Sequence, residues 1–311
     1  MRSDRYKPKH KKSGKSKKIL YFLLFIAVLA IIYSIYQYRQ GVSDSTQTSE
    51  IDQEKYEFNG NRDESGATNI LLLGSDARGD EQARADTIMI AHYNPDTGSY
   101  KVTSIMRDTY VDIPGHGKNK INAANAIGGP ELLRQTIKEN FDVDMQYYAI
   151  IDFEGFVRVI DEAFPQGVEV NVEKHMSENI GVTLQPGLQK LDGEHLLGYV
   201  RFRQDAVGDF GRVERQQNVI KEVAGQLASI QTIPKLPKLL GVITPFVNTN
   251  LDTGDMLFMG RGLLTANEKT IETLRIPVEG TFQNQRVSGA GAVLVIDIEA
   301  NRQALKTFIA S

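Results

Sequence analysis

Cysteine is absent from all 311 residues. Its absence excludes disulfides, thiol catalysis and cysteine-based metal sites, although it says nothing firm about the redox compartment. Charge is absent from residues 19–36, which read ILYFLLFIAVLAIIYSIY. A water-exposed segment of this length without charge is unusual, so this stretch is the first candidate for a special environment.

The uncharged stretch is long enough to cross a membrane. Eighteen helical residues span about 27 Å, close to the roughly 30 Å hydrocarbon core. Tyrosines at 21, 33, 36 and 38 lie near its ends, where amphipathic rings favour the interface. A cleaved signal peptide is the alternative, but no small-x-small site follows. The sequence therefore predicts an uncleaved signal anchor with residues 1–18 in the cytoplasm and residues from about 37 onward outside, as the positive-inside bias requires.

Charge is divided unevenly along the chain. Residues 1–18 contain nine basic residues and one acidic residue, whereas the remainder contains 27 basic and 38 acidic residues, a net of −11. The basic tail is explained by membrane topology beside anionic lipid. A strongly acidic remainder is a poor duplex binder, so we expect no nucleic-acid partner.

Beyond the anchor, the composition changes twice. Residues 37–65 are polar with almost no aliphatic residues, which predicts a flexible extracellular stalk. Residues 66–311 alternate β-branched apolar runs with helical patterns at 152–164, where Asp152 is a plausible N-cap, and at 210–230. This alternation predicts one three-layer α-β-α domain with a mixed central sheet.

Two predicted strands bracket the charged connection GSDARGDEQARADT at 74–87. Asp76 and Asp86 stand at either end of it, with Arg84 between them. Two carboxylates across one strand connection can meet at one divalent cation, and hard oxygen ligands favour Mg²⁺, with Mn²⁺ possible. The alternative is a solvated loop with surface ion pairs.

Basic residues recur beside three further apolar elements. Arg107 follows the apolar strand 100–106, where α/β proteins place ligand-contacting residues. Residues 115–130 combine glycines with Lys118 and Lys120 in an order that is not a nucleotide P-loop. This segment either presents backbone N–H groups and a lysine to an anion or is a plain turn.

The fourth cluster is YVRFRQDAVGDFGRVERQQ at 199–217. In an extended segment, Arg201 and Arg203 would point to the same side. Asp209 precedes a helix on which Arg212 and Gln216 lie about 40° apart and border the buried stripe. The alternative is a surface helix with arginines for solubility.

Taken together, the arginines predict a phosphate site. Arginine binds phosphate bidentately and keeps its charge. A diphosphate and a divalent cation held by two aspartates would neutralise such a cluster. The predicted guanidinium set is Arg84, Arg107, Arg201, Arg203 and Arg212.

The same stretches, in order, resemble the motifs of the LytR-CpsA-Psr family. They are NILLLGSDAR…RADT, SIMRDTYVDIPG, KINAANAIGGP, LQPGLQKLDGEHLLGYVRFRQD and GDFGRVERQQ, and they cover roughly residues 66–230. Met106 and Ala85 depart from the family, where proline and serine are frequent.

The resemblance implies a membrane-anchored, magnesium-dependent phosphotransferase. Its members move a glycopolymer, such as wall teichoic acid or capsular polysaccharide, from a polyprenyl-diphosphate carrier to peptidoglycan. Asp76 and Asp86 would be the metal ligands, and Arg84, Arg107, Lys120, Arg201 and Arg203 would bind the diphosphate. Asp209, Arg212 and Gln216 match the family's remaining polar positions.

Three points stay open at this level. The general base is either Asp86 or Asp76. The lipid needs an apolar groove, for which helix 152–164 and residues 191–200 are candidate walls, unless both are ordinary core. A hydrolase of polyprenyl diphosphates, with water as acceptor, and a non-enzymatic envelope regulator are the alternative functions.

Overall fold

The computed structural model describes residues 15–46, 56–61, 66–75, 85–229, 235–265 and 270–311. Its centre is a six-stranded sheet in the order β10-β3-β2-β1-β6-β9. β1 runs parallel to β6, and β3 runs parallel to β10, whereas the other neighbours are antiparallel. The predicted mixed sheet is confirmed. The strands are β1 (Thr68–Ser75), β2 (Ala85–Asn94), β3 (Ser99–Ile105), β6 (Tyr147–Asp152), β9 (Asn248–Thr249) and β10 (Ile271–Ile276).

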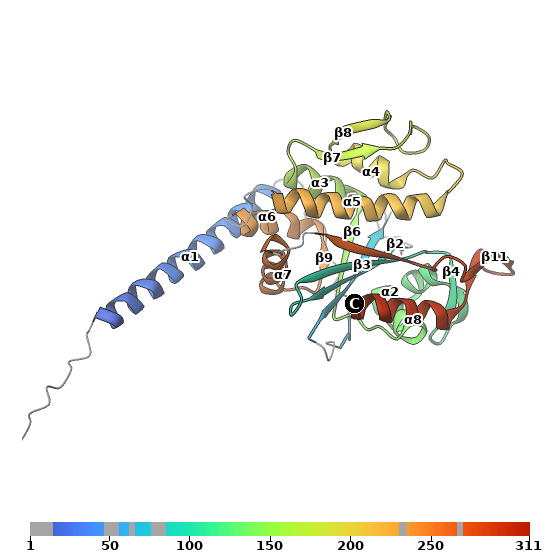
Figure 1. Ribbon diagram of the computed structural model, residues 1–311, viewed down its shortest axis with the longest axis horizontal. Coiled ribbons are helices and arrows are strands. Elements are labelled where there is room, and N and C mark those ends of the chain that lie inside the picture. Colours follow the sequence, from blue (N-terminus) through green and yellow to red (C-terminus); the bar gives the residue numbers. More distant parts are fainter. Residues whose placement is uncertain (1–14, 47–55, 62–65, 76–84, 230–234, 266–269) are drawn as a thin grey trace, which may run out of the picture.

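Helices cover both faces of this sheet, which gives the predicted three layers (Figure 1). α2 (Ile121–Phe141) and α8 (Ile298–Ala310) contact strands on one face. α3 (Phe153–Ala163), α4 (Gly193–Arg201) and α5 (Asp209–Ser229) form the layer on the other. The predicted N-cap is confirmed, because the Asp152 carboxylate accepts a hydrogen bond of 2.6 Å from the backbone N–H of Gly155.

Two smaller β elements complete the described domain. A four-stranded sheet has the order β11-β12-β4-β5, and a hairpin pairs β7 with β8. Separate apolar cores lie on the two sides: one joins the sheet to α2, and the other lies among α3, α4, α5 and the hairpin. The strands are β4 (Thr109–Ile113), β5 (Gly117–Lys120), β7 (Val168–Val172), β8 (Gly187–Leu191), β11 (Phe282–Val287) and β12 (Gly291–Ile296).

The segment 115–130 is not a plain turn. Its first part pairs with β4 as β5, and α2 begins at Ile121. α2 is interrupted where Gly129 has a φ of 65°, a left-handed conformation that glycine adopts without the Cβ clash of other residues. The part of α2 after this break, residues 130–141, is longer than the part before it.

The N-terminal helix α1 (Lys15–Thr46) projects away from the domain (Figure 1). Its segment Leu23–Ser43 is long and apolar enough to cross a membrane, and it overlaps the predicted anchor at 19–36. α1 ends by packing on α6 (Leu236–Ile243) and on the 3-10 helix η2 (Thr244–Phe246), and α7 (Thr253–Thr265) contacts α6 in turn.

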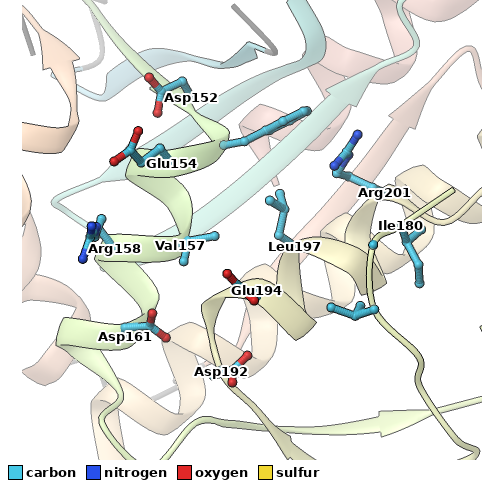
Figure 2. A pocket seen from close by; sticks show the side chains of 13 residues that line it. Asp152, Glu154, Val157, Arg158, Asp161, Ile180, Asp192, Glu194, Leu197 and Arg201 are labelled. Carbon is cyan, nitrogen blue, oxygen red and sulfur yellow. The ribbon is translucent and has the colours of Figure 1, made fainter. Parts of the chain in front are cut away.

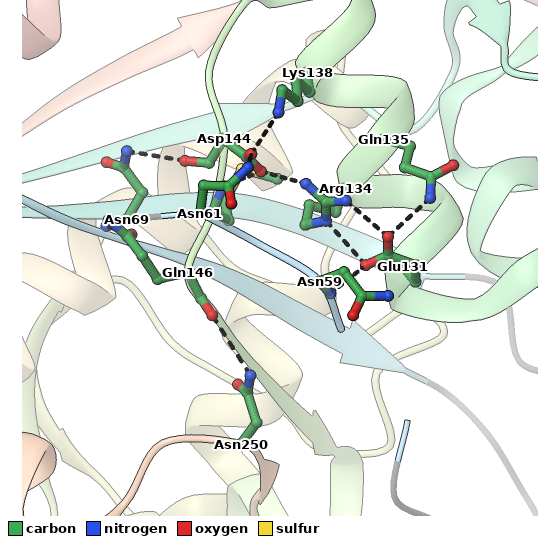
Figure 3. A network of polar contacts seen from close by, with 11 residues as sticks. Asn59, Asn61, Asn69, Glu131, Arg134, Gln135, Lys138, Asp144, Gln146 and Asn250 are labelled. Atoms are coloured by element: carbon green, nitrogen blue, oxygen red, sulfur yellow. Dashed lines mark hydrogen bonds and ion pairs between the residues drawn. The ribbon is translucent and has the colours of Figure 1, made fainter. Parts of the chain in front are cut away.

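The structure differs from the predicted stalk at 37–65. Residues 37–46 continue α1, and residues 56–61 lie against the domain. The backbone N–H of Asn59 donates to Glu131 at 2.9 Å, in a polar network whose buried centre is Arg134 (Figure 3). Aromatic side chains explain the difference, because Tyr56 and Phe58 pack on the core around Tyr148. The network lies beside the start of β1, at the end away from the charged cluster described below.

Candidate functional site

A cluster of charged side chains lies where β2 begins and β3 ends. Ile88 pairs with Ile105 across these antiparallel strands, so two residues further along Asp86 comes beside Arg107. The first turn of α5 brings Asp209 to the same place. The segment after α4 adds Arg203. Four pieces of chain that are distant in sequence therefore meet at one end of the central strands.

Two carboxylates and three guanidiniums interlock in this cluster. Asp86 is hydrogen-bonded by Arg107 and lies 3.7 Å from the guanidinium of Arg203. Asp209 lies 3.3 Å from Nε of Arg107, 3.7 Å from Arg203 and 3.0 Å from Arg212. Positive charge exceeds negative charge among these five groups, so the cluster suits an added anion.

Arg212 is the most deeply buried member, with only 4% of its side chain exposed. The pKa of Arg212 is lowered to about 10, mainly by burial and also by the nearby Arg203 and Arg107, against the opposing effects of Asp209 and Asp86. Burial alone would also lower the pKa of Arg107, but Asp209, Asp86 and Asp108 raise it above its ordinary value. Both arginines remain charged at neutral pH, and the neighbouring carboxylates do not fully offset the cost of burying the charge of Arg212.

Two guanidinium nitrogens in the cluster are buried without a hydrogen bond. Among the residues that the structure describes, Nε of Arg107 and Nε of Arg212 have no hydrogen-bond partner, and the same is true of Nε of Arg215 beside the cluster. Leaving a buried charged donor unsatisfied costs free energy, so unpaired donors of this kind are rare and call for an explanation. Phosphate oxygens are acceptors that would satisfy such donors.

Lys120 and Gln216 flank the cluster. Nζ of Lys120 pairs with Asp108 at 2.7 Å, and Asp108 lies 3.7 Å from Nε of Arg107. Gln216 donates to the hydroxyl of Thr87 at 3.0 Å. Sequence reasoning missed Asp108 and Thr87, although each directly follows a residue that it selected.

Arg201 does not lie beside Arg203, although an extended segment would have pointed the two side chains to the same side. The segment around it is helical, since Arg201 ends α4 and Phe202 is its C-cap. The two arginines therefore diverge: Arg203 lies at Asp86, whereas the guanidinium of Arg201 stacks 4.4 Å from the ring centroid of Phe153.

Arg215 holds in place the segment that follows α4. Its guanidinium donates to the backbone carbonyl of Phe202 at 2.6 Å and pairs with Asp205 at 3.1 Å and with Glu173 at 2.9 Å. These contacts fix the segment that carries Arg203. Arg215 is as buried as Arg212, yet its surroundings are compensated by two carboxylates.

An apolar cavity of about 310 Å³ adjoins the cluster. Its floor comes from β1, β2 and β6, and its walls come from α3, α4 and α5. Phe156 and Val200 confirm that both predicted wall segments line a cavity. Thr87, Gln216 and Arg201 are polar residues at its border; Thr87 directly follows Asp86 in β2 and Gln216 lies one turn after Arg212 in α5, so the cavity ends next to the charged cluster.

A larger, hydrophilic hollow of about 900 Å³ lies between α3 and α4 (Figure 2). Five of its thirteen lining residues are acidic, and two of these have structural roles: Asp161 accepts from Gly193 N–H, and Asp192 caps α4. Asp152, Phe153, Leu197 and Arg201 line both this hollow and the apolar cavity. These four residues therefore form the boundary between them.

Asp76 and Arg84 lie outside the described residues. No group of three metal-binding side chains occurs in the part of the chain that the structure describes. Asp86 does present a hard oxygen donor, partly exposed, at the centre of the cluster. The chemistry of this donor fits Mg²⁺ or Mn²⁺, with the second predicted ligand beyond the described ranges.

Comparison with known proteins identifies the family. The profile of the LytR_cpsA_psr family matches residues 32–307. The chain belongs to the LytR_cpsA_psr family. This match extends well beyond the motif region at 66–230 and includes the last strands and α8.

Relatives within the LytR_cpsA_psr family carry two kinds of name. The chain is 41% identical over 274 residues to the regulatory protein MsrR of Staphylococcus aureus, covering 88% of this chain and 84% of that one. It is 36% identical over 261 residues to the polyisoprenyl-teichoic acid–peptidoglycan teichoic acid transferase TagU of Oceanobacillus iheyensis, covering 82% and 79%.

Solved structures share the fold. Crystalline B. subtilis TagV is 27% identical, with a TM-score of 0.68 over 78% of this chain and 97% of that one. TagT bound to LIIa-WTA is 27% identical, with a TM-score of 0.63 over 85% and 98%. The layered α/β fold with its mixed sheet is thus shared with these LytR_cpsA_psr structures.

Proposed function

We propose that this protein is a phosphotransferase that moves a glycopolymer of wall-teichoic-acid or capsular type from a polyprenyl-diphosphate carrier to a sugar hydroxyl of peptidoglycan. The names of TagU and of TagT bound to a wall-teichoic-acid ligand support this activity within the family. One observation in this chain carries the proposal: a cationic cluster with unsatisfied donors adjoins an apolar cavity.

The two halves of the site match the two halves of a polyprenyl diphosphate. Arg107, Arg203 and Arg212 offer guanidiniums to the diphosphate, and Phe156 and Val200 offer apolar surface to the prenyl chain. Charge and apolar surface occur side by side in the ligand as they do in the protein. A ligand that lacked either half would leave part of the site unsatisfied.

The chemistry follows from charge stabilisation. The acceptor hydroxyl oxygen attacks the phosphorus that bears the glycopolymer, and the bond from this phosphorus to the bridging oxygen breaks. Polyprenyl phosphate leaves with the electron pair, and the hydroxyl proton passes to a carboxylate, for which Asp86 and Asp76 are the candidates. Fixed guanidiniums beside the phosphates stabilise the charge that develops on their oxygens.

A divalent cation completes the proposal. Asp86 and Asp76 would hold Mg²⁺, with Mn²⁺ as a substitute, and Arg84 would join the diphosphate-binding arginines. When bound, the cation supplies Lewis-acid charge at the phosphate oxygens. Asp86 now faces Arg107 and Arg203, so the carboxylate is already placed beside the groups that would bind phosphate.

The anchor helix places this activity at a membrane. We propose a single-pass protein with residues 1–18 in the cytoplasm and the catalytic domain outside, because the basic tail precedes the apolar span. Lipid-linked substrate and peptidoglycan acceptor would then both be on the side of the domain.

A regulatory role is the second candidate, favoured by the printed name of MsrR. A transfer assay separates the candidates: full-length protein receives lipid-linked polymer with and without peptidoglycan fragments. We expect polymer to join the fragments in the wild type and not in Arg107→Ala. Polymer released with a phosphate end regardless of acceptor would indicate a hydrolase, and no turnover, together with full complementation of a deletion strain by Arg107→Ala, would indicate a regulator.

A further inference from the structure

The anchor helix is clamped to the catalytic domain by two glycines. Gly41 of α1 and Gly241 of α6 are both buried where the helices cross. A Cβ at Gly41 would collide with the carbonyl oxygen of Lys238 and lie 3.0 Å from the backbone nitrogen of Val242. A Cβ at Gly241 would collide with the carbonyl oxygen of Tyr38. Small residues on both sides allow the backbones to touch, as they do in helix pairs within membranes.

This clamp lies just beyond the uncharged stretch 19–36 and at the C-terminal end of the apolar segment Leu23–Ser43. Tyr36, 62% exposed, and Tyr33, 55% exposed, lie on the free part of α1. Gly41 is five residues further on, about 7–8 Å along the helix axis. Tyrosines favour the membrane–water interface. α6 is therefore held at the level of the lipid headgroups or immediately above them.

The elements beside the clamp present an exposed aromatic residue. α6 reads LPKLLGVI, of which Leu236, Pro237, Gly241 and Val242 are buried and the rest partly buried, and it contacts α7, whose Phe258 is 60% exposed although it is a large apolar residue. Lys235 and Arg39 are exposed near the same level, where basic side chains pair with anionic headgroups. Figure 1 shows α6 and α7 at the end of the domain from which α1 projects.

The same end of the domain adjoins the apolar cavity. Val247 lines the cavity and directly follows η2, which contacts α1. From there the cavity crosses β6 and β1 to Thr87 beside the charged cluster. An apolar path thus connects the edge of the sheet at the anchor with the proposed diphosphate site.

We propose that α6 and α7 form a membrane-docking surface that lies in the bilayer interface, with Phe258 inserted, and that the Gly41–Gly241 clamp fixes the domain in this orientation. The occupant of the surface is the lipid bilayer that α1 crosses. One consequence rests on the proposed function: a prenyl chain would enter the cavity from the membrane at Val247 without crossing water. The docking itself depends only on the anchor and these helices.

The test uses the absence of cysteine, which makes single labels unambiguous. Full-length Phe258→Cys and Leu188→Cys proteins are labelled with an environment-sensitive fluorophore and reconstituted in vesicles that contain anionic lipid and lipid-bound quenchers. Leu188 is the matched control: it is 68% exposed, equally apolar and located on the distal β7–β8 hairpin. Because interfacial helices bury their apolar face about 5–10 Å deep, we expect roughly threefold stronger quenching at 258 than at 188.

A second arm tests the clamp. Gly41→Leu should reduce quenching at 258 to the level at 188, because the added side chain separates α1 from α6. Gly225→Leu is the control, since the space around a Cβ at this helical glycine is open, and it should change nothing.

Equal quenching at 258 and 188 in the two labelled proteins would overturn the proposal. This comparison needs no substitution at the buried helix contact. A blue-shifted label at 258 that lipid quenchers do not reach would assign the surface to a protein partner and overturn it too. Unchanged quenching in Gly41→Leu would refute the clamp. No arm measures catalysis, so a failure of the transferase assignment would leave these results unaffected.

Discussion

Replacing Arg212 by methionine should remove the free-energy cost of burying its charge in the ligand-free protein and should also weaken anion binding. The pKa of Arg212 falls from 12.5 to about 10 because burial and the neighbouring Arg203 and Arg107 disfavour its charge. A shift of this size corresponds to about 3 kcal/mol that the folded state bears at every pH below about 10. Methionine fills similar space without charge, and Asp209 keeps Arg107 and Arg203 as partners.

We therefore expect the free energy of unfolding of Arg212→Met to lie between the wild-type value and a value about 3 kcal/mol higher. For a domain of this size, 1 kcal/mol corresponds to roughly 2–4 °C in Tm. Thermal unfolding of the detergent-solubilised full chain, followed by circular dichroism, measures this. Added inorganic diphosphate at 100-fold its Kd should stabilise the wild type by about 2.7 kcal/mol. The variant should gain clearly less.

Arg215→Met is the matched control on the same helix. Arg215 is equally buried but is compensated by Asp205, Glu173 and the carbonyl of Phe202. Removing it takes one cation from Asp205, which is only 6% exposed and keeps Lys174 at 3.3 Å, and leaves the carbonyl of Phe202 without this donor, so we expect a loss of roughly 1–3 kcal/mol. If Arg212→Met lost as much stability as Arg215→Met, or kept the full diphosphate response, the assignment of Arg212 to anion binding would be wrong.

Three further outcomes are expected. Arg107→Lys should lower the transfer rate on lipid-linked polymer by roughly 100-fold, because a lysine lacks the planar fork; a rate within twofold of the wild type would contradict this. Leu72→Trp, which fills the apolar cavity, should raise KM for a long-prenyl substrate more than for a short-prenyl one, and equal effects would remove the prenyl chain from the cavity. Although burial opposes it, Arg134 lowers the pKa of Glu131, and Lys138 and Arg134 lower the pKa of Asp144, so the stabilisation by these carboxylates is present above about pH 4 and is lost as pH falls through their folded-state values. Arg134→Met should therefore show a smaller loss of unfolding free energy between pH 7 and pH 3 in urea titrations than the wild type, and an equal loss would refute the coupling.

Local sequence signals were sufficient wherever neighbouring residues determine the outcome. An acidic N-cap before an apolar stripe predicted α3, and the strand before Arg107 placed this arginine at the sheet edge. The meeting of Asp86 with Arg107 follows from one antiparallel register, so a correct strand assignment was nearly enough.

Other features depend on contacts between distant residues. The alternation of Arg201 and Arg203 around an aromatic residue is compatible with a strand, but α4 continues through Arg201 from a cap at Asp192, nine residues earlier. The anchor contact joins Gly41 to Gly241, for which no nearby pattern exists. The polar stretch after the anchor indicated a stalk, yet two aromatics in it were enough to dock on the core.

Photocrosslinking tests the central claim most directly: one site holds both halves of a polyprenyl diphosphate. A polyprenyl diphosphate with a photoreactive group on its prenyl chain is bound to the full-length protein, irradiated and located by mass spectrometry of peptides. We expect labelling at cavity residues such as Phe156 and Val200, suppressed by excess unlabelled diphosphate lipid and strongly reduced in Arg107→Ala. Labelling elsewhere, or labelling of the cavity that persists unchanged in Arg107→Ala, would contradict it.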